Sequence, residues 1–360
     1  MLDVSERPHG ANANGLRTHV KAALARWVLH KRRDLLDGGR PRPAAHDEAT
    51  HPWDGRRRFA EDYVFAAVQD DLGLLVRLEW LPGRAAHRVW LMLLRDGEAW
   101  WIPPEQTIVT QAVVDRWHVA GLALDCVKPL MRWTLRYQGR LHPAAPATPR
   151  AREPGRRCEL NLVFDATGDP FVPGVDDDPE LVARRLGEAQ WDPALLRAVR
   201  RAARRGYVQV GRFVGTAVLG HDVARIDGVG VRQHGWGVQD WGAPERAVQS
   251  LIVDGDTVAW IQQAEFPAFT LEGGFAAGPL GWQSITALRQ AVHTGGGGEY
   301  KLEIDGARGP RMWSLPTRHA VEMRVDGRGS FDLAFVGRAG GVLGLWATQG
   351  RTLPRSLAVR

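Results

Sequence analysis

Residues 232–241 read Arg-Gln-His-Gly-Trp-Gly-Val-Gln-Asp-Trp, and this stretch points most directly to the fold. In an extended strand, side chains alternate between two faces with a period of two. One predicted face therefore carries Arg232, His234, Trp236 and Asp240. The glycines between them permit close approach of a neighbouring backbone or a ligand, or a bulge. Two interpretations stay open: a catalytic face, and a buried tryptophan whose neighbours satisfy one another's hydrogen bonds.

On both sides of this stretch, apolar segments are separated by tight turns. Strands are predicted before it at 63–68, 74–81, 88–94, 99–102, 131–137, 158–164 and 207–219. After it, residues 248–266, 302–312 and 321–336 are predicted hairpins, each turning at an Asp-Gly pair. Successive strands with tight turns predict an antiparallel meander that forms a barrel or a curled sheet.

Two segments of the sequence have helical character. Residues 17–36 carry an apolar stripe with basic residues around it. We expect this helix to dock on the protein, and the alternative is contact with an anionic membrane surface. Between 178 and 206, the pairs Asp178-Pro179 and Asp192-Pro193 each place an N-cap residue before a proline. Gly206 is expected to end the second of these helices.

The predicted fold class is therefore all-β, with two antiparallel β-barrel or curled-sheet domains joined by a helical segment. Residues 1–52 form an N-terminal helix and linker, and residues 53–177 form the first β domain. Residues 178–206 are the helical connector. Residues 207–360 form the second β domain, which carries the 232–241 stretch.

The amino-acid composition limits the classes of binding partner that we expect. The formal net charge is +6 and comes largely from arginine, but the basic face from Arg197 to Arg205 has no aromatic reader beside it, so no nucleic-acid partner is predicted. Fifteen tryptophans predict sizeable apolar surfaces or a cavity, hence a hydrophobic small molecule as partner.

The number of cysteines bears on the cellular location, since two cysteines fit a reducing cytoplasm. No signal-peptide or membrane-span pattern is present, so the expected location is the cytoplasm, with membrane contact only through the N-terminal helix. The oligomeric state is left open.

Common catalytic motifs do not occur in this sequence. It contains no Gly-x-Ser-x-Gly elbow, no His-Glu-x-x-His helix and no Cys-x-x-Cys pair. A glycine pair at 228 and 230 leads into a strand, unlike a dinucleotide fingerprint, which leads into a helix. We therefore predict no metal and no cofactor.

The run from His234 to Trp241 resembles the His-x-Trp-Gly signature of the double lipocalin-like family. That family contains carotenoid 1,2-hydratases, AttH-like proteins, tocopherol cyclases and fungal Diels–Alderases. Residues 97–100 and 130–137 also resemble recurrent segments of bacterial relatives, and the similarity covers residues 55–350. Many relatives have serine and arginine where this chain has Gly235 and Gln239. The resemblance implies two lipocalin-like domains.

The resemblance also implies a chemistry. The hydratases protonate an isoprenoid double bond, and histidine and aromatic side chains stabilise the cation. An indole face can contribute about 2 kcal/mol to such a cation in a dry site, and a carboxyl buried among apolar rings is held protonated. The candidate catalytic residues are then His234, Trp236, Asp240 and Glu265. The candidate substrate-binding residues are Arg232, Trp241, Trp260 and Gln263. Glutamines and Glu265 stand where a Tyr/Asp pair is expected, which counts against a strict hydratase.

Three hypotheses for the function remain. The first is an enzyme that hydrates, cyclises or isomerises an isoprenoid or polyene in a tryptophan-lined cavity by acid initiation. The second is a non-catalytic carrier of an apolar ligand, because lipocalin-like cavities serve binding as well as chemistry. The third is an interaction protein that docks a partner on the Arg197–Arg205 face.

Overall fold

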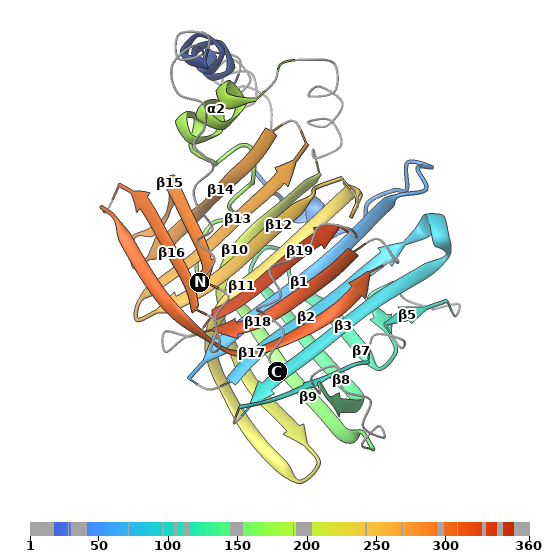
Figure 1. The fold of residues 1–360 in the computed structure, drawn as a ribbon. Coiled ribbons are helices and arrows are strands. Elements are labelled where there is room, and N and C mark those ends of the chain that lie inside the picture. Colours follow the sequence, from blue (N-terminus) through green and yellow to red (C-terminus); the bar gives the residue numbers. More distant parts are fainter. Residues whose placement is uncertain are drawn as a thin grey trace.

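The computed structural model describes most of the chain between residues 18 and 348. The described residues are 18–27, 29, 42–70, 72–95, 97–103, 107–110, 116–144, 154–189, 191, 204–241, 243–267, 269–293, 299–307, 309–325, 329–336 and 341–348. Of residues 290–293, 299 and those from 315 onward, only the backbone is described. Strands dominate, which confirms the predicted all-β class (Figure 1).

The first sheet has eleven strands in the order β4-β3-β2-β1-β11-β10-β9-β8-β7-β6, with β5 paired to β3. A further pairing of β4 with β8 curls this sheet round on itself. Its strands are β1 (Phe59–Gln69), β2 (Leu72–Leu81), β3 (Ala86–Arg95), β4 (Glu98–Trp101), β5 (Ile108–Val109), β6 (His118–Val119), β7 (Leu122–Lys128), β8 (Arg132–Pro143), β9 (Arg156–Ala166), β10 (Arg205–Leu219) and β11 (Asp222–Val238).

The second sheet is a closed antiparallel barrel in which each strand pairs with the next along the chain. Its strands are β12 (Arg246–Asp254), β13 (Thr257–Phe266), β14 (Phe269–Gly278), β15 (Gly281–His293), β16 (Glu299–Gly306), β17 (Arg311–Val325), β18 (Gly329–Val336) and β19 (Gly341–Thr348). Besides the N-terminal helix, the described helices are η1 (Ala45–Glu48), η2 (Pro82–Arg84) and α2 (Pro179–Glu188).

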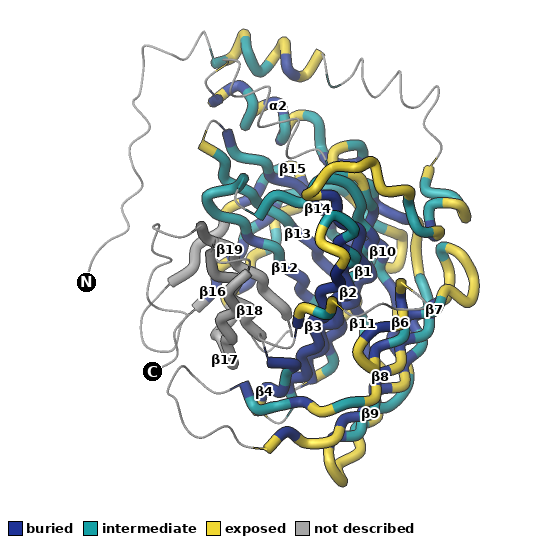
Figure 2. The backbone as a smooth tube through the Cα atoms, turned by 90° about the vertical axis from the view of Figure 1, so that its right-hand side faces the viewer, coloured by how far each residue is buried: buried dark blue, intermediate teal, exposed yellow. Residues whose placement is uncertain are grey.

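Apolar side chains pack in three main clusters, as the period-two alternation requires. One fills the concave interior of the first sheet and includes Phe65, Trp133 and Phe164. The second lies between the two sheets and joins Trp90 and other residues of the first sheet to residues such as Trp260 of the barrel. The third fills the barrel, where α2 adds one buried leucine. Buried segments therefore follow β1, β2, β3 and β10 to β14 through the centre of the molecule (Figure 2).

The division between the sheets differs from the predicted domain boundaries. Residues 207–238 were assigned to the second domain, but β10 pairs with β9 and β11 pairs with β1, so both belong to the first sheet. The physical reason is the register of Phe59 to Val68 against Val229 to Val238, an antiparallel pairing that a long sequence separation hides. The sheets divide between β11 and β12, and not across residues 178–206.

The connector contains the first predicted helix. Asp178 caps α2 by accepting a hydrogen bond from the Leu181 backbone N–H at 2.8 Å, and Pro179 is its first residue. Residues 192–203 of the predicted second helix, with Arg197, lie outside the described residues. Gly206 does not end a helix there. It lies in β10, where a side chain would meet the carbonyl oxygen of His234 at 2.3 Å.

The N-terminal helix is present at residues 18–27 and lies beside α2 (Figure 2). It docks through its small face, because a Cβ at Gly187 of α2 would sit 2.8 Å from the Cβ of Ala22. The predicted apolar stripe faces outward, with exposed fractions of 61%, 47% and 58% at Val20, Leu24 and Trp27. Docking is thus achieved by small residues and not by the stripe. No helix among the described residues is long and apolar enough to cross a membrane.

Candidate functional site

His234 occupies a fully buried position on β11, facing the concave interior of the first sheet. Its Nε2 lies 3.0 Å from Oε1 of Glu61 on the neighbouring strand β1. Tyr63, two residues along β1 from Glu61, stacks on the His234 ring with centroids 4.1 Å apart and planes 15° apart. Tyr207 of β10 meets the same ring edge-on at 5.6 Å. The pairing of β11 with β1 and β10 therefore holds the His234 imidazole in one orientation.

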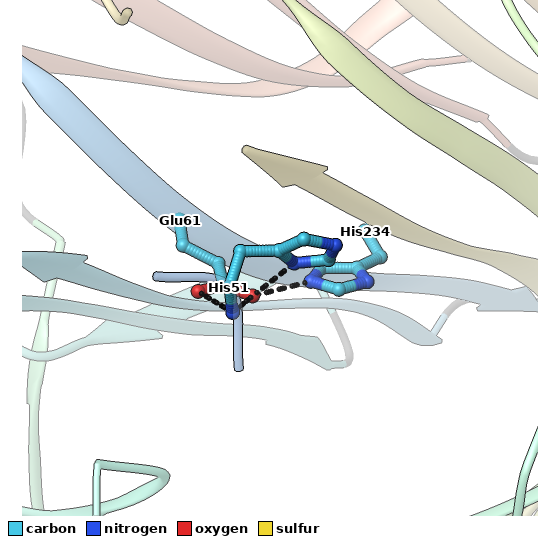
Figure 3. Close-up of side chains that lie close together, drawn as sticks. All are labelled: His51, Glu61 and His234. Carbon is cyan, nitrogen blue, oxygen red and sulfur yellow. Dashed lines mark hydrogen bonds and ion pairs between the residues drawn. The ribbon is translucent and has the colours of Figure 1, made fainter. Parts of the chain in front are cut away.

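His51 reaches the same carboxylate from outside the sheets. It follows η1 in the chain, and its Nδ1 lies 2.9 Å from Oε1 of Glu61 (Figure 3). Its backbone N–H also donates to Glu61, at 3.0 Å to Oε2. The His51 ring stacks on Trp236 with centroids 3.8 Å apart and planes 11° apart. His51, Glu61 and His234 form one cluster, called the triad below.

An ion pair and hydrogen bonds hold the segment that carries His51 against the first sheet. Glu48 forms a two-bond ion pair with Arg232, at 2.8 Å for each bond. The Tyr63 hydroxyl donates to the Glu48 carbonyl oxygen at 3.0 Å. Trp117 donates its indole N–H to the hydroxyl of Thr50 at 3.2 Å. These contacts fix the chain on both sides of residue 49 and so place the His51 ring.

The protonation states of the triad follow from burial and hydrogen bonding. Burial alone would raise the pKa of Glu61, but the hydrogen bonds from His234 and His51 outweigh it and lower that pKa below 4.5. Burial lowers the pKa of His234 below 6.5, and its bond to Glu61 offsets only part of this. At neutral pH Glu61 is thus an ionised acceptor and His234 a neutral ring whose Nε2–H donates. His234 Nδ1 is then a buried lone pair with no hydrogen-bond partner among the described residues.

Arg232 extends the cluster along β11. Its guanidinium is buried against the rings of Trp133 and Tyr207, at 5.4 and 5.2 Å. It also donates to the Gln209 side-chain oxygen. With Glu48 as counter-ion, this cation is part of the framework of the site.

The predicted face of β11 is real for three of its four members. Arg232, His234 and Trp236 all contact Tyr207, and the His234 and Trp236 rings are 5.0 Å apart. Asp240 lies beyond the end of β11 and forms an ion pair with Arg58.

The other predicted site residues lie elsewhere. Trp241 packs against Arg77 and Trp90, at the core between the two sheets, and Trp260 is buried in that core. Glu265 pairs with Arg246 at 3.4 Å across β12 and β13 and is partly exposed. Gln263 donates to Glu272 at 2.7 Å. These contacts all lie away from the triad.

The sequence analysis did not identify two members of the triad, Glu61 and His51. Glu61 lies two residues before the predicted strand at 63–68, so extending the alternation backwards from Tyr63 would have placed it on the same face. His51 stands in the proline- and alanine-rich segment assigned to the linker, and no local pattern marks it. A pocket among the described residues, lined by Thr257, Ser284, Arg311 and others of the barrel, includes no triad residue.

The triad could also hold a metal ion. One ligand atom each from His51, Glu61 and His234 lie within 4.8 Å of one another. Two neutral imidazoles and one carboxylate are a donor set that suits divalent transition metals.

The chain folds as two antiparallel β units, a curled sheet and a closed barrel. It resembles a putative AttH of Nitrosomonas europaea with a TM-score of 0.51 and 11% identity, covering 86% of this chain and 98% of that one. The predicted resemblance is therefore confirmed at the level of the fold. The chain belongs to the family described as "Domain of unknown function (DUF7064)", whose model matches residues 44–275. This range contains the whole triad.

More distant similarity extends to two further structures. Kievitone hydratase of Nectria haematococca is 9% identical, with a TM-score of 0.44, covering 87% of this chain and 94% of that one. CghA is 13% identical, with a TM-score of 0.44, covering 82% and 90%. No curated protein matched the sequence.

Proposed function

We propose that the protein is an enzyme that moves a proton on an apolar small molecule, of the isoprenoid or polyene class, at the His51–Glu61–His234 triad. Isomerisation, cyclisation, and addition or removal of water all need such a step. One observation carries the proposal: a buried carboxylate accepts hydrogen bonds from two imidazoles beside a stacked indole. A site that only binds an apolar ligand does not require this arrangement.

His51 is the residue that we assign as the proton acceptor. Because its Nδ1–H donates to Glu61, its Nε2 carries a lone pair, and the side chain is 18% exposed. A substrate lying at the ring edge, with its C–H in the imidazole plane, would give its proton to Nε2. The imidazolium that forms would gain an ion pair with Glu61 and a cation–π contact with Trp236. Return of the proton to a different substrate atom completes an isomerisation or a cyclisation.

This assignment moves the acid–base chemistry away from the carboxylates that the sequence suggested. Asp240 and Glu265 each form an ion pair with an arginine, Arg58 and Arg246 respectively. An ionised Glu61 with a lowered pKa is a poor acid at neutral pH, so we assign the first step to a base, His51, and not to an acid. General acid–base assistance of this kind is worth about 10²- to 10⁴-fold in rate.

The test uses solvent deuterium, because exchange reports proton transfer before the product is known. The protein is incubated in D₂O with a panel of isoprenoids, retinoids, fatty acids and polyenes, and each compound is analysed by mass spectrometry. We expect deuterium incorporation into at least one compound, and its loss by about 100-fold or more in Glu61→Gln and His51→Ala. His118→Ala is the control, because that histidine pairs with Asp125 in an exposed His–carboxylate contact.

The alternative is a carrier of apolar ligands. A carrier would bind a compound, raise the melting temperature by mass action, and incorporate no deuterium. That result in wild-type protein would reject the enzyme. Deuterium incorporation that survives both triad substitutions would reject the triad as its centre.

A further inference from the structure

We propose that His51, Glu61 and His234 bind one divalent transition-metal ion of the Zn²⁺ class. This inference goes beyond the proposed function, because it concerns what occupies the triad and holds whether or not the protein is an enzyme. Nothing in the sequence suggested it, since the two histidines are separated by most of the first sheet and neither belongs to a metal-binding motif.

The distances between ligand atoms fit an ion. Both ring nitrogens approach the same carboxylate oxygen, Glu61 Oε1, at 2.9 and 3.0 Å. Two metal bonds of about 2.1 Å at the tetrahedral angle place their ligand atoms about 3.4 Å apart, and the three ligand atoms here all lie within 4.8 Å of one another. An ion could therefore bind once the three side chains shift to make these separations equal. Figure 3 shows both rings directed at this oxygen.

The ligands are held in place before any ion arrives. Glu61 and His234 come from paired strands, where Glu61 stands opposite Trp236 and Tyr63 stands opposite His234. The His234 ring is fixed by its stack on Tyr63, and the His51 ring by its stack on Trp236. Preorganised ligands lose little conformational entropy on binding, which favours affinity.

Two of the three ligands are buried and one is partly exposed. Glu61 and His234 are buried, whereas the His51 side chain is 18% exposed. Three protein ligands leave the fourth position of a four-coordinate ion for a water or a substrate, as in catalytic sites. A bound Zn²⁺ would supply a water of lowered pKa.

An ion that binds the ring nitrogen facing Glu61 leaves the N–H of each ring on the other nitrogen. For His51 that nitrogen is Nε2, on the partly exposed ring. For His234 it is Nδ1, which is buried without a hydrogen-bond partner among the described residues. An unsatisfied buried N–H weakens binding by about 10- to 100-fold, so we expect a micromolar dissociation constant.

The test titrates the metal alone into chelator-treated full-length protein. Zn²⁺ is followed by calorimetry, and Co²⁺ by the visible absorption of a low-coordinate site. We expect one ion per chain in wild-type protein and affinity reduced by about tenfold or more in His51→Ala. His51 lies outside the strands, so this variant keeps the sheet pairing, which circular dichroism checks. Glu61→Gln provides a second test where it folds.

The matched control is His118→Ala, which removes the histidine of an exposed His–carboxylate pair, 2.7 Å from Asp125. Binding should be unchanged in this variant. The proposal is overturned if wild-type protein binds no stoichiometric ion, if His51→Ala binds as tightly as wild type, or if His118→Ala abolishes binding. The deuterium experiment is run on metal-free protein, because an ion on His51 Nδ1 places the ring N–H on Nε2, the nitrogen that would accept the substrate proton. Proton exchange without metal binding, and metal binding without proton exchange, then separate the two proposals.

Discussion

Arg232 and Glu48 form a buried ion pair although they are 184 positions apart in the chain. Both guanidinium amino groups donate to the carboxylate at 2.8 Å, and the side chains are 0% and 2% exposed. Glu48 is the last residue of η1, three residues before His51. The pair therefore ties the segment that carries one triad histidine to the strand that carries the other.

Removal of one partner should strongly destabilise the fold. Arg232→Met leaves Glu48 as a buried charge without its counter-ion, and such changes cost about 3–5 kcal/mol. The control is Arg132→Met, because Arg132 pairs with Asp165 at 54% and 42% exposure, where solvent screens an ion pair and its contribution to stability is small. Urea unfolding measures both. Equal losses in the two variants would contradict a structural role for the buried pair.

The pH dependence of the free energy of unfolding should report the protonation of His234 and Glu61. The pKa of His234 is lowered from 6.5 in the folded protein, so the unfolded chain takes up a proton more readily. The stabilisation that comes from the lowered pKa of His234 is fully present above about pH 6.5. It is lost as the pH falls towards the folded pKa, by up to about 1.4 kcal/mol per pH unit. Glu61, whose pKa is lowered from 4.5, adds a second loss at more acidic pH.

A variant isolates the histidine contribution. His234→Gln cannot titrate, so the difference in unfolding free energy between wild type and variant should shrink as the pH falls below 6.5. Chemical unfolding at half-unit steps of pH measures this difference. A difference that stays constant from pH 8 to pH 5 would show that His234 is not held neutral.

The carboxylates that the sequence suggested should be dispensable for proton transfer. Asp240→Asn and Glu265→Gln each remove one member of an ion pair with a partly exposed arginine, Arg58 or Arg246. We expect unfolding free energies within about 1 kcal/mol of wild type and unchanged deuterium exchange. If either variant loses exchange while keeping its melting temperature, that carboxylate belongs to the catalytic centre after all.

Trp236 should contribute to chemistry more than to folding. Trp236→Leu keeps an apolar side chain but removes the ring that stacks on His51 at 3.8 Å. Loss of a cation–π contact with the His51 imidazolium, worth about 1–2 kcal/mol, should slow exchange by roughly tenfold. Trp53→Leu is the control, because that indole is 46% exposed and donates to the Arg56 carbonyl. Equal exchange in the two variants would remove Trp236 from the mechanism.

The sequence by itself determined the local features of this protein. Period-two alternation placed Arg232, His234 and Trp236 on one face of one strand, and the contacts of all three with Tyr207 confirm it. Turn residues between apolar segments predicted an antiparallel all-β protein, and the Asp178-Pro179 pair predicted the start of α2. Each of these features depends on residues within a few positions of one another.

Tertiary structure decided which strands are neighbours, and with them the site. Side chains alternate between the two faces only within the strand. Asp240 lies two residues past the end of β11, so it is not on the predicted face and pairs with Arg58 instead. Pairing of β11 with β1, as well as with β10, brought Glu61 to His234 and moved the sheet boundary. The buried Glu48–Arg232 pair then carried His51 to the same carboxylate. Strand partners and buried ion pairs depend on the free energy of contacts across most of the chain, and a local pattern contains no information about them.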